Sequence, residues 1–164
     1  MRIVFMGSPV FAVPSLEALI RAGRRVIGVV TQPDRPRGRR LRPRPTPVKE
    51  VALRHELQVW QPPKVGDAAF VDLMGELMPD VIVVVAFGQI LPPEILCLPR
   101  YGCINVHASL LPRYRGAAPI HRAIINGEVQ TGITTMYMDE GLDTGDIIFQ
   151  APLPISEEDN AGTV

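Results

Sequence analysis

The stretch that decides the fold is DVIVVVAFG, residues Asp80–Gly88. It is an uninterrupted apolar run rich in β-branched residues, with an acidic residue before it and a glycine after it. A run without polar alternation is typical of a parallel strand that is buried on both faces. It is also far too short to span a bilayer. We therefore predict a central strand here, in a sheet that helices cover.

Shorter apolar runs around this strand alternate with helix-like patterns. Strands are predicted at residues 2–6, 25–31, 57–60 and 102–108, and helices at 14–22, 46–56, 67–78, 92–98 and 117–125. Strands 132–138 and 146–155 are separated only by a Gly-rich turn, which predicts an antiparallel pair near the C-terminus. The alternation predicts an α/β fold over residues 1–164, with a mainly parallel central sheet flanked by helices. Ligands of such sheets bind beyond the carboxyl ends of the strands.

The composition excludes several classes of protein. The chain has 164 residues and no net charge, so no global field draws it to nucleic acid or to a membrane. Its two cysteines, Cys97 and Cys103, match no metal or redox spacing and are expected to be buried free thiols. The N-terminus enters a strand directly and shows no signal peptide. We expect a soluble monomer in the cytoplasm, or in an organelle matrix if the source is eukaryotic.

The charge is nevertheless concentrated in one segment. Residues 35–44, RPRGRRLRPR, hold six arginines, so the rest of the chain carries a net charge of −6. This segment is too polar and too rich in proline to fold alone, and one interpretation is a solvated, disordered loop. The alternative is a clamp for the phosphate backbone of a nucleic acid, which becomes ordered when it binds. We favour the clamp.

A second unusual segment is INVHASLLPRYRG, Ile104–Gly116. Side chains alternate along a strand, so Asn105 and His107 share one face. An amide beside an imidazole offers hydrogen-bond donors to a developing oxyanion. Asp139, Asp143 and Asp146 lie on the Gly-rich turn farther along the chain, and an aspartate beside a histidine fixes its tautomer. A lone histidine at a strand end is often only structural, so this pattern is a hypothesis.

Other chemistries fit less well. Ser109 lacks the sequence of a nucleophile elbow. His55 and His121 lie in predicted helices without partners at metal-ligand spacing, so we expect no metal. The turn GSPVFAVP after the first strand matches neither a dinucleotide-binding nor a P-loop pattern. These features favour group transfer to an external nucleophile over covalent catalysis.

Two stretches together, NVHASLLPRYRGAAPI and MDEGLDTGDI, resemble the folate-dependent formyltransferases, which keep the same order and spacing of Asn, His and Asp. Two others, FMGSPVFAVPSLEALI and VVTQPDRPRGRRL, are similar to the methionyl-tRNA branch of that family. The resemblance covers essentially the whole chain. It implies a Rossmann-like domain that uses 10-formyltetrahydrofolate as co-substrate and the amino group of initiator methionyl-tRNA as acceptor.

The resemblance also implies the site residues. The catalytic residues would be Asn105, His107 and Asp143 at the carboxyl edge of the sheet. The folate-binding residues would be Phe87, Gly88, Gln89, Ile90, Ser109, Leu110, Leu111 and Pro112. The tRNA-binding residues would be Arg35, Arg37, Arg39, Arg40, Arg42 and Arg44.

The C-terminal stretch ISEEDNAGTV carries helix-start signals and then stops. We therefore expect a formyltransferase domain that is incomplete at its C-terminal end, without the OB-like tRNA-binding domain that follows in the family. Two alternatives remain: a formyltransferase for the amine of a sugar nucleotide, and a nucleic-acid-binding module with an inactive site.

Overall fold

The computed structural model describes residues 1–37 and 42–164. Two compact units make up this part of the chain: unit 1, Met1–Cys103, and unit 2, Ile104–Val164. No helix among the described residues is long and apolar enough to cross a membrane.

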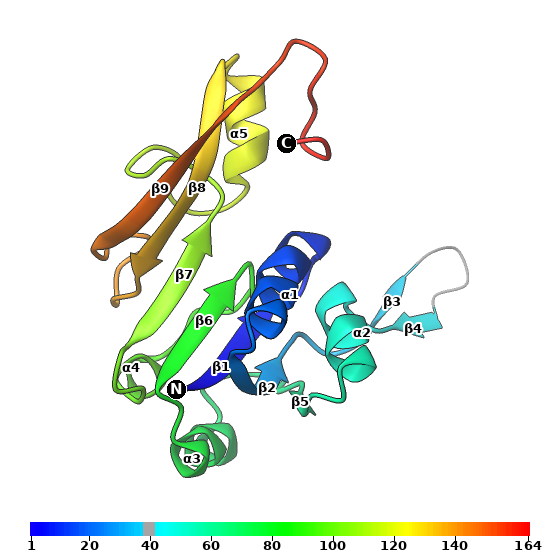
Figure 1. Cartoon of the computed structure of the whole chain (residues 1–164), viewed down its shortest axis with the longest axis vertical. Helices are drawn as coiled ribbons and strands as arrows, with labels where there is room; N and C mark the ends of the chain where they lie inside the picture. Colours follow the sequence, from blue (N-terminus) through cyan, green and yellow to red (C-terminus); the bar gives the residue numbers. More distant parts are fainter. Residues whose placement is uncertain (38–41) are drawn as a thin grey trace. The chain divides into compact units, whose positions relative to one another are not determined.

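Unit 1 is built on four parallel strands (Figure 1): β1 (Arg2–Gly7), β2 (Arg25–Val30), β5 (Val59–Trp60) and β6 (Val81–Val85). Their order is β5-β2-β1-β6, so the first strand lies between the second and the fourth parallel strand. This is the strand order of a Rossmann-like half-sheet. The parallel sheet of the predicted α/β class is thus confirmed, and its β1/β6 boundary is the point where such sheets bind ligands.

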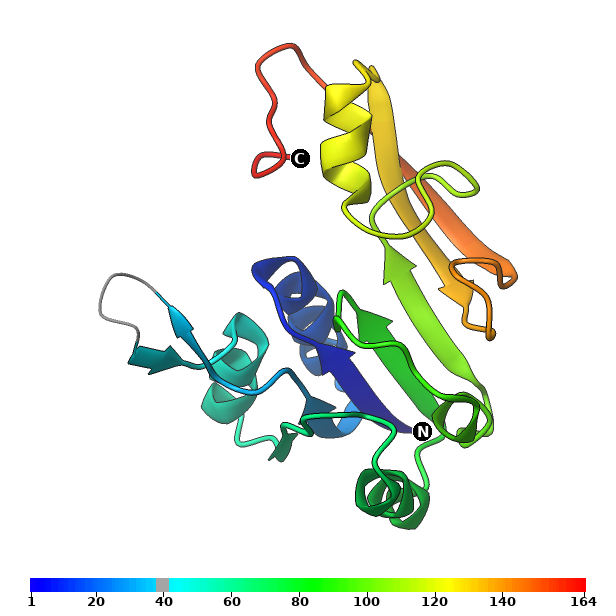
Figure 2. The same ribbon diagram turned by 180° about the vertical axis from the view of Figure 1, so that it is seen from behind.

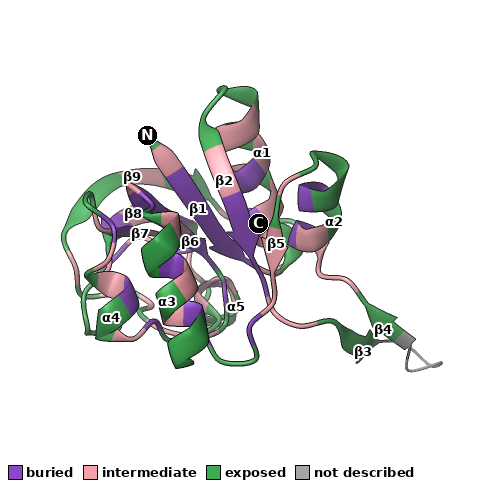
Figure 3. Cartoon of the chain, turned by 90° about the horizontal axis from the view of Figure 1, so that it is seen from below, coloured by how far each residue is buried: buried purple, intermediate pink, exposed green. Residues whose placement is uncertain are grey.

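The helices of unit 1 pack as two pairs. The 3₁₀ turn η1 (Val10–Ala12) leads into α1 (Val13–Arg21), which contacts α2 (Pro47–Arg54), and α3 (Ala68–Leu77) contacts α4 (Pro93–Leu96). In Figure 3 β1 is buried almost along its whole length. The core is completed by fully buried apolar side chains of the strands and helices: Ile3, Phe5, Leu16, Met74, Ile82 and Ile95. Burial of this kind supplies most of the stabilisation of the unit.

Unit 2 is an antiparallel sheet with one helix. Its strands are β7 (Cys103–His107), of which Ile104–His107 belong to this unit, β8 (Gln130–Tyr137) and β9 (Ile147–Pro154), in the order β7-β8-β9. The helix α5 (Pro119–Ile125) lies between β7 and β8 in the sequence. The antiparallel pair predicted near the C-terminus is therefore confirmed.

Both ends of the arginine-rich segment form secondary structure. Arg35–Arg37 and Arg42–Arg44 form two short antiparallel strands, β3 and β4 (Figure 2). Pro36 lies opposite Pro43. Pairs in an antiparallel ladder alternate between hydrogen-bonded and non-hydrogen-bonded, and two prolines at a non-hydrogen-bonded pair cost the ladder no donor. The predicted tRNA contacts Arg39 and Arg40 lie outside the described residues.

The prediction that both cysteines are buried is confirmed for Cys103 and wrong for Cys97. Cys103 is buried, and burial raises the pKa of its thiol to about 12. Cys97 is exposed because it follows the single turn of α4 rather than continuing a helix into the core.

Candidate active site

Strand β7 carries the two polar side chains expected on one face. Asn105 pairs with Met136 of β8, and His107 pairs with Thr134 two residues along. Asn105 is half-buried and His107 is buried. Because the period of a strand is two, the two side chains point to the same side of the sheet.

Asp143 joins them from the connection between β8 and β9. Its Oδ1 accepts a hydrogen bond from Asn105 Nδ2 at 3.3 Å, and its Oδ2 lies 3.5 Å from His107 Nδ1. The backbone N–H of Gly116 donates to the same Oδ2 at 2.8 Å. The side chains of His107 and Asp143 are only 8% and 12% exposed, so water screens their interaction weakly. The structure therefore brings the three expected catalytic side chains together.

The backbone around this cluster adopts an uncommon conformation. Asp143 has φ 52°, and Tyr114 and Ala118 in the connection after β7 have φ 58° and 54°. Residues other than glycine cost free energy in this left-handed region, and such residues concentrate at functional sites. In Asp143 this conformation accompanies a carboxylate that contacts both Asn105 and His107.

His107 is held by both ring nitrogens. Its Nε2 lies 2.9 Å from the carbonyl oxygen of Tyr114, and since a carbonyl only accepts, Nε2 carries the proton of this contact. Its Nδ1 faces the carboxylate of Asp143. The Tyr114 hydroxyl in turn donates to Glu128 at 2.6 Å, and this hydrogen bond is the largest cause of the lowered pKa of Glu128. The imidazole thus has a fixed orientation, as a group that handles a proton requires.

The other two aspartates of the Gly-rich turn, Asp139 and Asp146, are not part of this cluster. The side chain of Asp139 accepts from the backbone of Gly141 and from the hydroxyl of Thr144, which closes the turn on itself. Asp146 contributes its carbonyl oxygen to the N–H of Tyr137. Only Asp143 contacts Asn105 and His107, so the structure separates one functional candidate from two turn residues.

Residues that the sequence did not single out support the expected folate loop of unit 2. Thr134 Oγ1 donates to the carbonyl of Ser109 at 2.6 Å and accepts from the N–H of Leu111 at 3.1 Å. Gln150 Nε2 donates to the carbonyl of Leu111 at 2.9 Å. Ser109 and Leu111 are buried, whereas Pro112 is exposed. In the sequence, the sign of this support is a polar residue, Thr134, within a predicted strand of mainly apolar residues.

The expected folate residues of unit 1 follow β6. Phe87 is buried, and its carbonyl accepts from Ser8 Oγ and from Gln32 Nε2, both at 3.2 Å. Gln89 accepts from the N–H of Val65 at 2.7 Å, which holds the loop from the other side. The side chain of Ile90 is 88% exposed. The loop is therefore rigidly placed and still presents an apolar side chain.

A cavity of about 500 Å³ opens in unit 1 beside this loop. It is lined by Ser8 after β1, by Phe87 and Gly88 after β6, and by Arg35 and Arg44 of the basic strands. The cavity thus lies beyond the carboxyl ends of β1 and β6, and its volume is within the range of small-ligand sites. Among residues 1–37 and 42–164, no group of three or more His, Cys, Asp or Glu side chains is placed to hold a metal ion.

Similar proteins identify the family of this chain. The family model described as formyl transferase matches residues 1–164. A methionyl-tRNA formyltransferase of Pelotomaculum thermopropionicum is 65% identical over 164 residues, covering 100% of this chain and 52% of that protein. One of Clostridioides difficile is 58% identical over 162 residues, covering 99% and 52%. The chain spans about half the length of these curated relatives.

Solved structures show the same fold. A phosphoribosylglycinamide formyltransferase from Bacillus halodurans superposes with a TM-score of 0.81 at 26% identity, covering 99% of this chain and 84% of that one. A sugar N-formyltransferase from a Shewanella species superposes with a TM-score of 0.70 at 23% identity, covering 98% and 60%. With a family model that matches from the first residue to the last, the chain belongs to the formyl transferase family.

Proposed function

We propose that the protein containing this chain transfers the formyl group of 10-formyltetrahydrofolate to the α-amino group of initiator methionyl-tRNA, in the cytoplasm. The observation that carries the proposal is the cluster in which Asp143 holds both Asn105 and His107. The identity of the acceptor is supported by relatives at 58–65% identity that are named methionyl-tRNA formyltransferases.

In the proposed reaction the amine nitrogen attacks the formyl carbon on N10 of the folate. A new C–N bond forms, and the carbonyl oxygen becomes the oxyanion of a tetrahedral intermediate. Asn105 Nδ2 and an imidazole N–H of His107 are donors on one strand face, and they stabilise this negative charge. Asn105 Nδ2 has a second N–H besides the one that Asp143 accepts, whereas the proton on His107 Nε2 has to leave the carbonyl of Tyr114 to reach the oxyanion.

Collapse of the intermediate completes the transfer. The bond between the formyl carbon and N10 breaks, and a proton moves from the attacking amine to N10. His107 is the group in the cluster that can exchange a proton, and Asp143 orients it and stabilises its protonated form. The products are formylmethionyl-tRNA and tetrahydrofolate, so no oxidant or metal is required.

The binding residues remain proposals for each unit. In unit 1, the exposed Ile90 beside the fixed carbonyl of Phe87 suits a flat ring with a polar edge. In unit 2, we assign the same role to Ser109–Pro112. Arg35 and Arg44 form no ion pair with an acidic side chain of the described residues, so their guanidinium groups keep donors for RNA phosphates.

The proposal is tested by formyl transfer to methionyl-tRNA from 10-formyltetrahydrofolate. The chain should be assayed alone and extended by the C-terminal half of a relative, each with and without residues 35–44. We expect transfer by the extended protein and a large loss of transfer to methionyl-tRNA when residues 35–44 are removed. Folate binding without transfer to methionyl-tRNA at either length would contradict the proposal and indicate a small amine, such as an amino-sugar nucleotide, as acceptor.

A further inference from the structure

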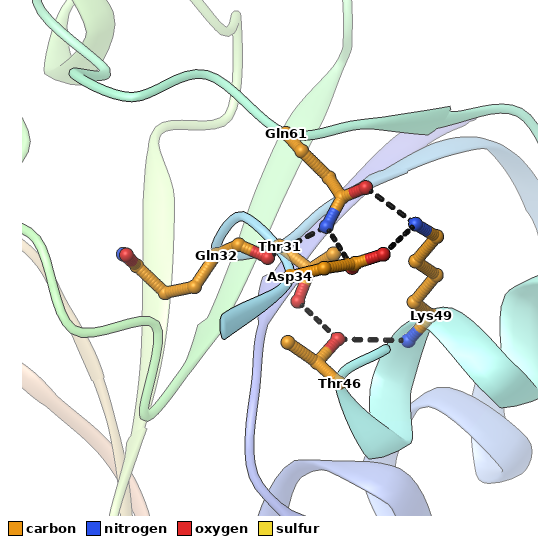
Figure 4. A network of polar contacts seen from close by, with 6 residues as sticks. All are labelled: Thr31, Gln32, Asp34, Thr46, Lys49 and Gln61. Atoms are coloured by element: carbon orange, nitrogen blue, oxygen red, sulfur yellow. Dashed lines mark hydrogen bonds and ion pairs between the residues drawn. The ribbon is translucent and has the colours of Figure 1, made fainter. Parts of the chain in front are cut away.

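Both ends of the basic hairpin, β3 and β4, are tied into one network of polar contacts (Figure 4). Asp34 immediately precedes β3, and Thr46 follows β4 after a single proline. The network joins them to the end of β2, to α2 and to the residue after β5. The two points where the hairpin leaves unit 1 are therefore fixed by side chains rather than by the chain alone.

Three side chains form a closed triangle at Asp34. Lys49 Nζ donates to Asp34 Oδ2 and to Gln61 Oε1, both at 2.7 Å, and Gln61 Nε2 donates to Asp34 Oδ1 at 2.7 Å. These contacts lower the pKa of Asp34, chiefly through the hydrogen bond from Lys49 and then the one from Gln61. Gln61 Nε2 also donates to the carbonyl of Gln32 at 2.8 Å. Asp34 therefore stays charged and fixed near neutral pH.

The other end is held by hydroxyl groups. Thr46 Oγ1 lies 2.6 Å from Oγ1 of the fully buried Thr31, and it accepts from the N–H of Lys49 at 3.1 Å. Thr46 is thus the N-cap of α2 and the anchor of β4 at once. Lys49 takes part at both ends, through its backbone at Thr46 and through its ammonium at Asp34.

The negative charge of Asp34 does not by itself favour RNA binding. A carboxylate beside the arginines of a hairpin that binds RNA repels phosphate, and it engages the ammonium of Lys49, which would otherwise attract phosphate. Electrostatic attraction alone would favour a neutral residue in place of Asp34. Its contacts instead serve geometry, because they set the direction in which the chain enters Arg35.

We propose that Asp34, held by Lys49 and Gln61, is a positioning residue that orients the basic hairpin for the phosphates of the acceptor tRNA. This inference rests on the proposed function. It concerns binding of the acceptor and not the formyl-transfer chemistry, so its signature is a changed KM for tRNA at constant kcat.

The substitution Asp34→Ala distinguishes a positioning role of Asp34 from a purely electrostatic one, because the two roles predict opposite changes in the affinity for methionyl-tRNA. Loss of the repulsive charge alone would tighten binding of methionyl-tRNA. Loss of positioning should weaken binding about tenfold. It should also make the negative slope of log K against log salt less steep by about one, as expected for one lost phosphate contact. Glu50→Ala is the matched control: it removes an exposed carboxylate from α2 outside the network and should leave the affinity unchanged or slightly tighter.

The experiment uses the extended protein and measures binding of methionyl-tRNA over a salt series, with kcat and both KM values. Gln61→Leu should also weaken tRNA binding, although it changes no charge. Asp34→Asn should bind tRNA more tightly than Asp34→Ala does. The KM for folate and the kcat at saturating tRNA should stay within twofold. Tighter or unchanged binding in Asp34→Ala would overturn the inference, whereas absence of tRNA binding by the unsubstituted protein would overturn the proposed function itself.

Discussion

Replacing Asp143 by asparagine tests the candidate active site most sharply, because the change removes a charge and almost no volume. Asp143 has φ 52°, and asparagine tolerates this left-handed conformation better than most residues. The backbone should therefore keep its course, so any loss of activity reports on the contacts of the carboxylate.

The size of the effect follows from the geometry. When His107 carries a proton during the transfer, its Nδ1 lies 3.5 Å from a full negative charge. At an effective dielectric constant of about 20, this attraction amounts to about 5 kcal/mol. An asparagine retains a neutral hydrogen bond worth about 1 kcal/mol. The net loss of about 4 kcal/mol in the transition state corresponds to about a 10³-fold lower rate.

The assay is a single-turnover measurement of formyl transfer at saturating methionyl-tRNA, which isolates the chemical step from binding and product release. Asp139→Asn is the matched control, since Asp139 lies on the same turn but contacts Gly141 and Thr144 instead of the cluster. We expect the control to retain activity within a fewfold. A rate for Asp143→Asn within tenfold of the unsubstituted protein would refute the assignment of Asp143.

The remaining predictions concern separate features of the chain. Asn105→Ala removes one proposed oxyanion donor and should lower kcat by about 10²–10³ without unfolding unit 2, which kinetics and circular dichroism together will check. Thr46→Ala removes the acceptor for the N–H of Lys49 and should destabilise unit 1 by about 1–2 kcal/mol in urea unfolding, whereas Thr46→Ser should be nearly neutral. Because burial raises the pKa of Cys103 from 9.0 to about 12, its contribution to stability is complete below pH 9 and is lost as the pH rises towards 12. At pH 8, alkylation followed by mass spectrometry should find the exposed Cys97 modified in the native protein and Cys103 only after unfolding.

The regular elements were predictable because their patterns are local. The apolar run Asp80–Gly88 contains β6 (Val81–Val85), and the helix predicted at 46–56 contains α2 (Pro47–Arg54) with Thr46 as its cap. Uniform burial of a central parallel strand leaves a continuous apolar run, and capping leaves a residue of defined type. Each signal lies within about ten residues, so neither requires knowledge of the tertiary structure.

Features that join distant segments were not predictable in the same way. The pairing of Arg35–Arg37 with Arg42–Arg44 forms two short strands that no pattern in their sequence predicts. The triangle of Asp34, Lys49 and Gln61 brings together three elements that no periodicity connects. Such contacts depend on the packing of the whole unit, which one sequence does not encode in any local pattern.

The candidate site likewise contains one feature that the sequence predicts and one that it does not. The shared face of Asn105 and His107 follows from the period of a strand, and it was predictable from the residues alone. The choice of Asp143 over Asp139 and Asp146 was not, and it came only from the family resemblance. In the structure the difference is physical: Asp143 reaches the cluster, while Asp139 closes its own turn.

The central claim is that methionyl-tRNA is the acceptor, and one competition experiment tests it directly. The extended protein receives labelled 10-formyltetrahydrofolate together with equal concentrations of methionyl-tRNA, glycinamide ribonucleotide and an amino-sugar nucleotide, and the formylated products are separated. We predict that the label appears on methionyl-tRNA at least 10²-fold faster than on either small amine. The preference should fall steeply with salt if, as proposed, the arginines of the hairpin contact phosphates. Transfer to a small amine at an equal or higher rate would contradict the account.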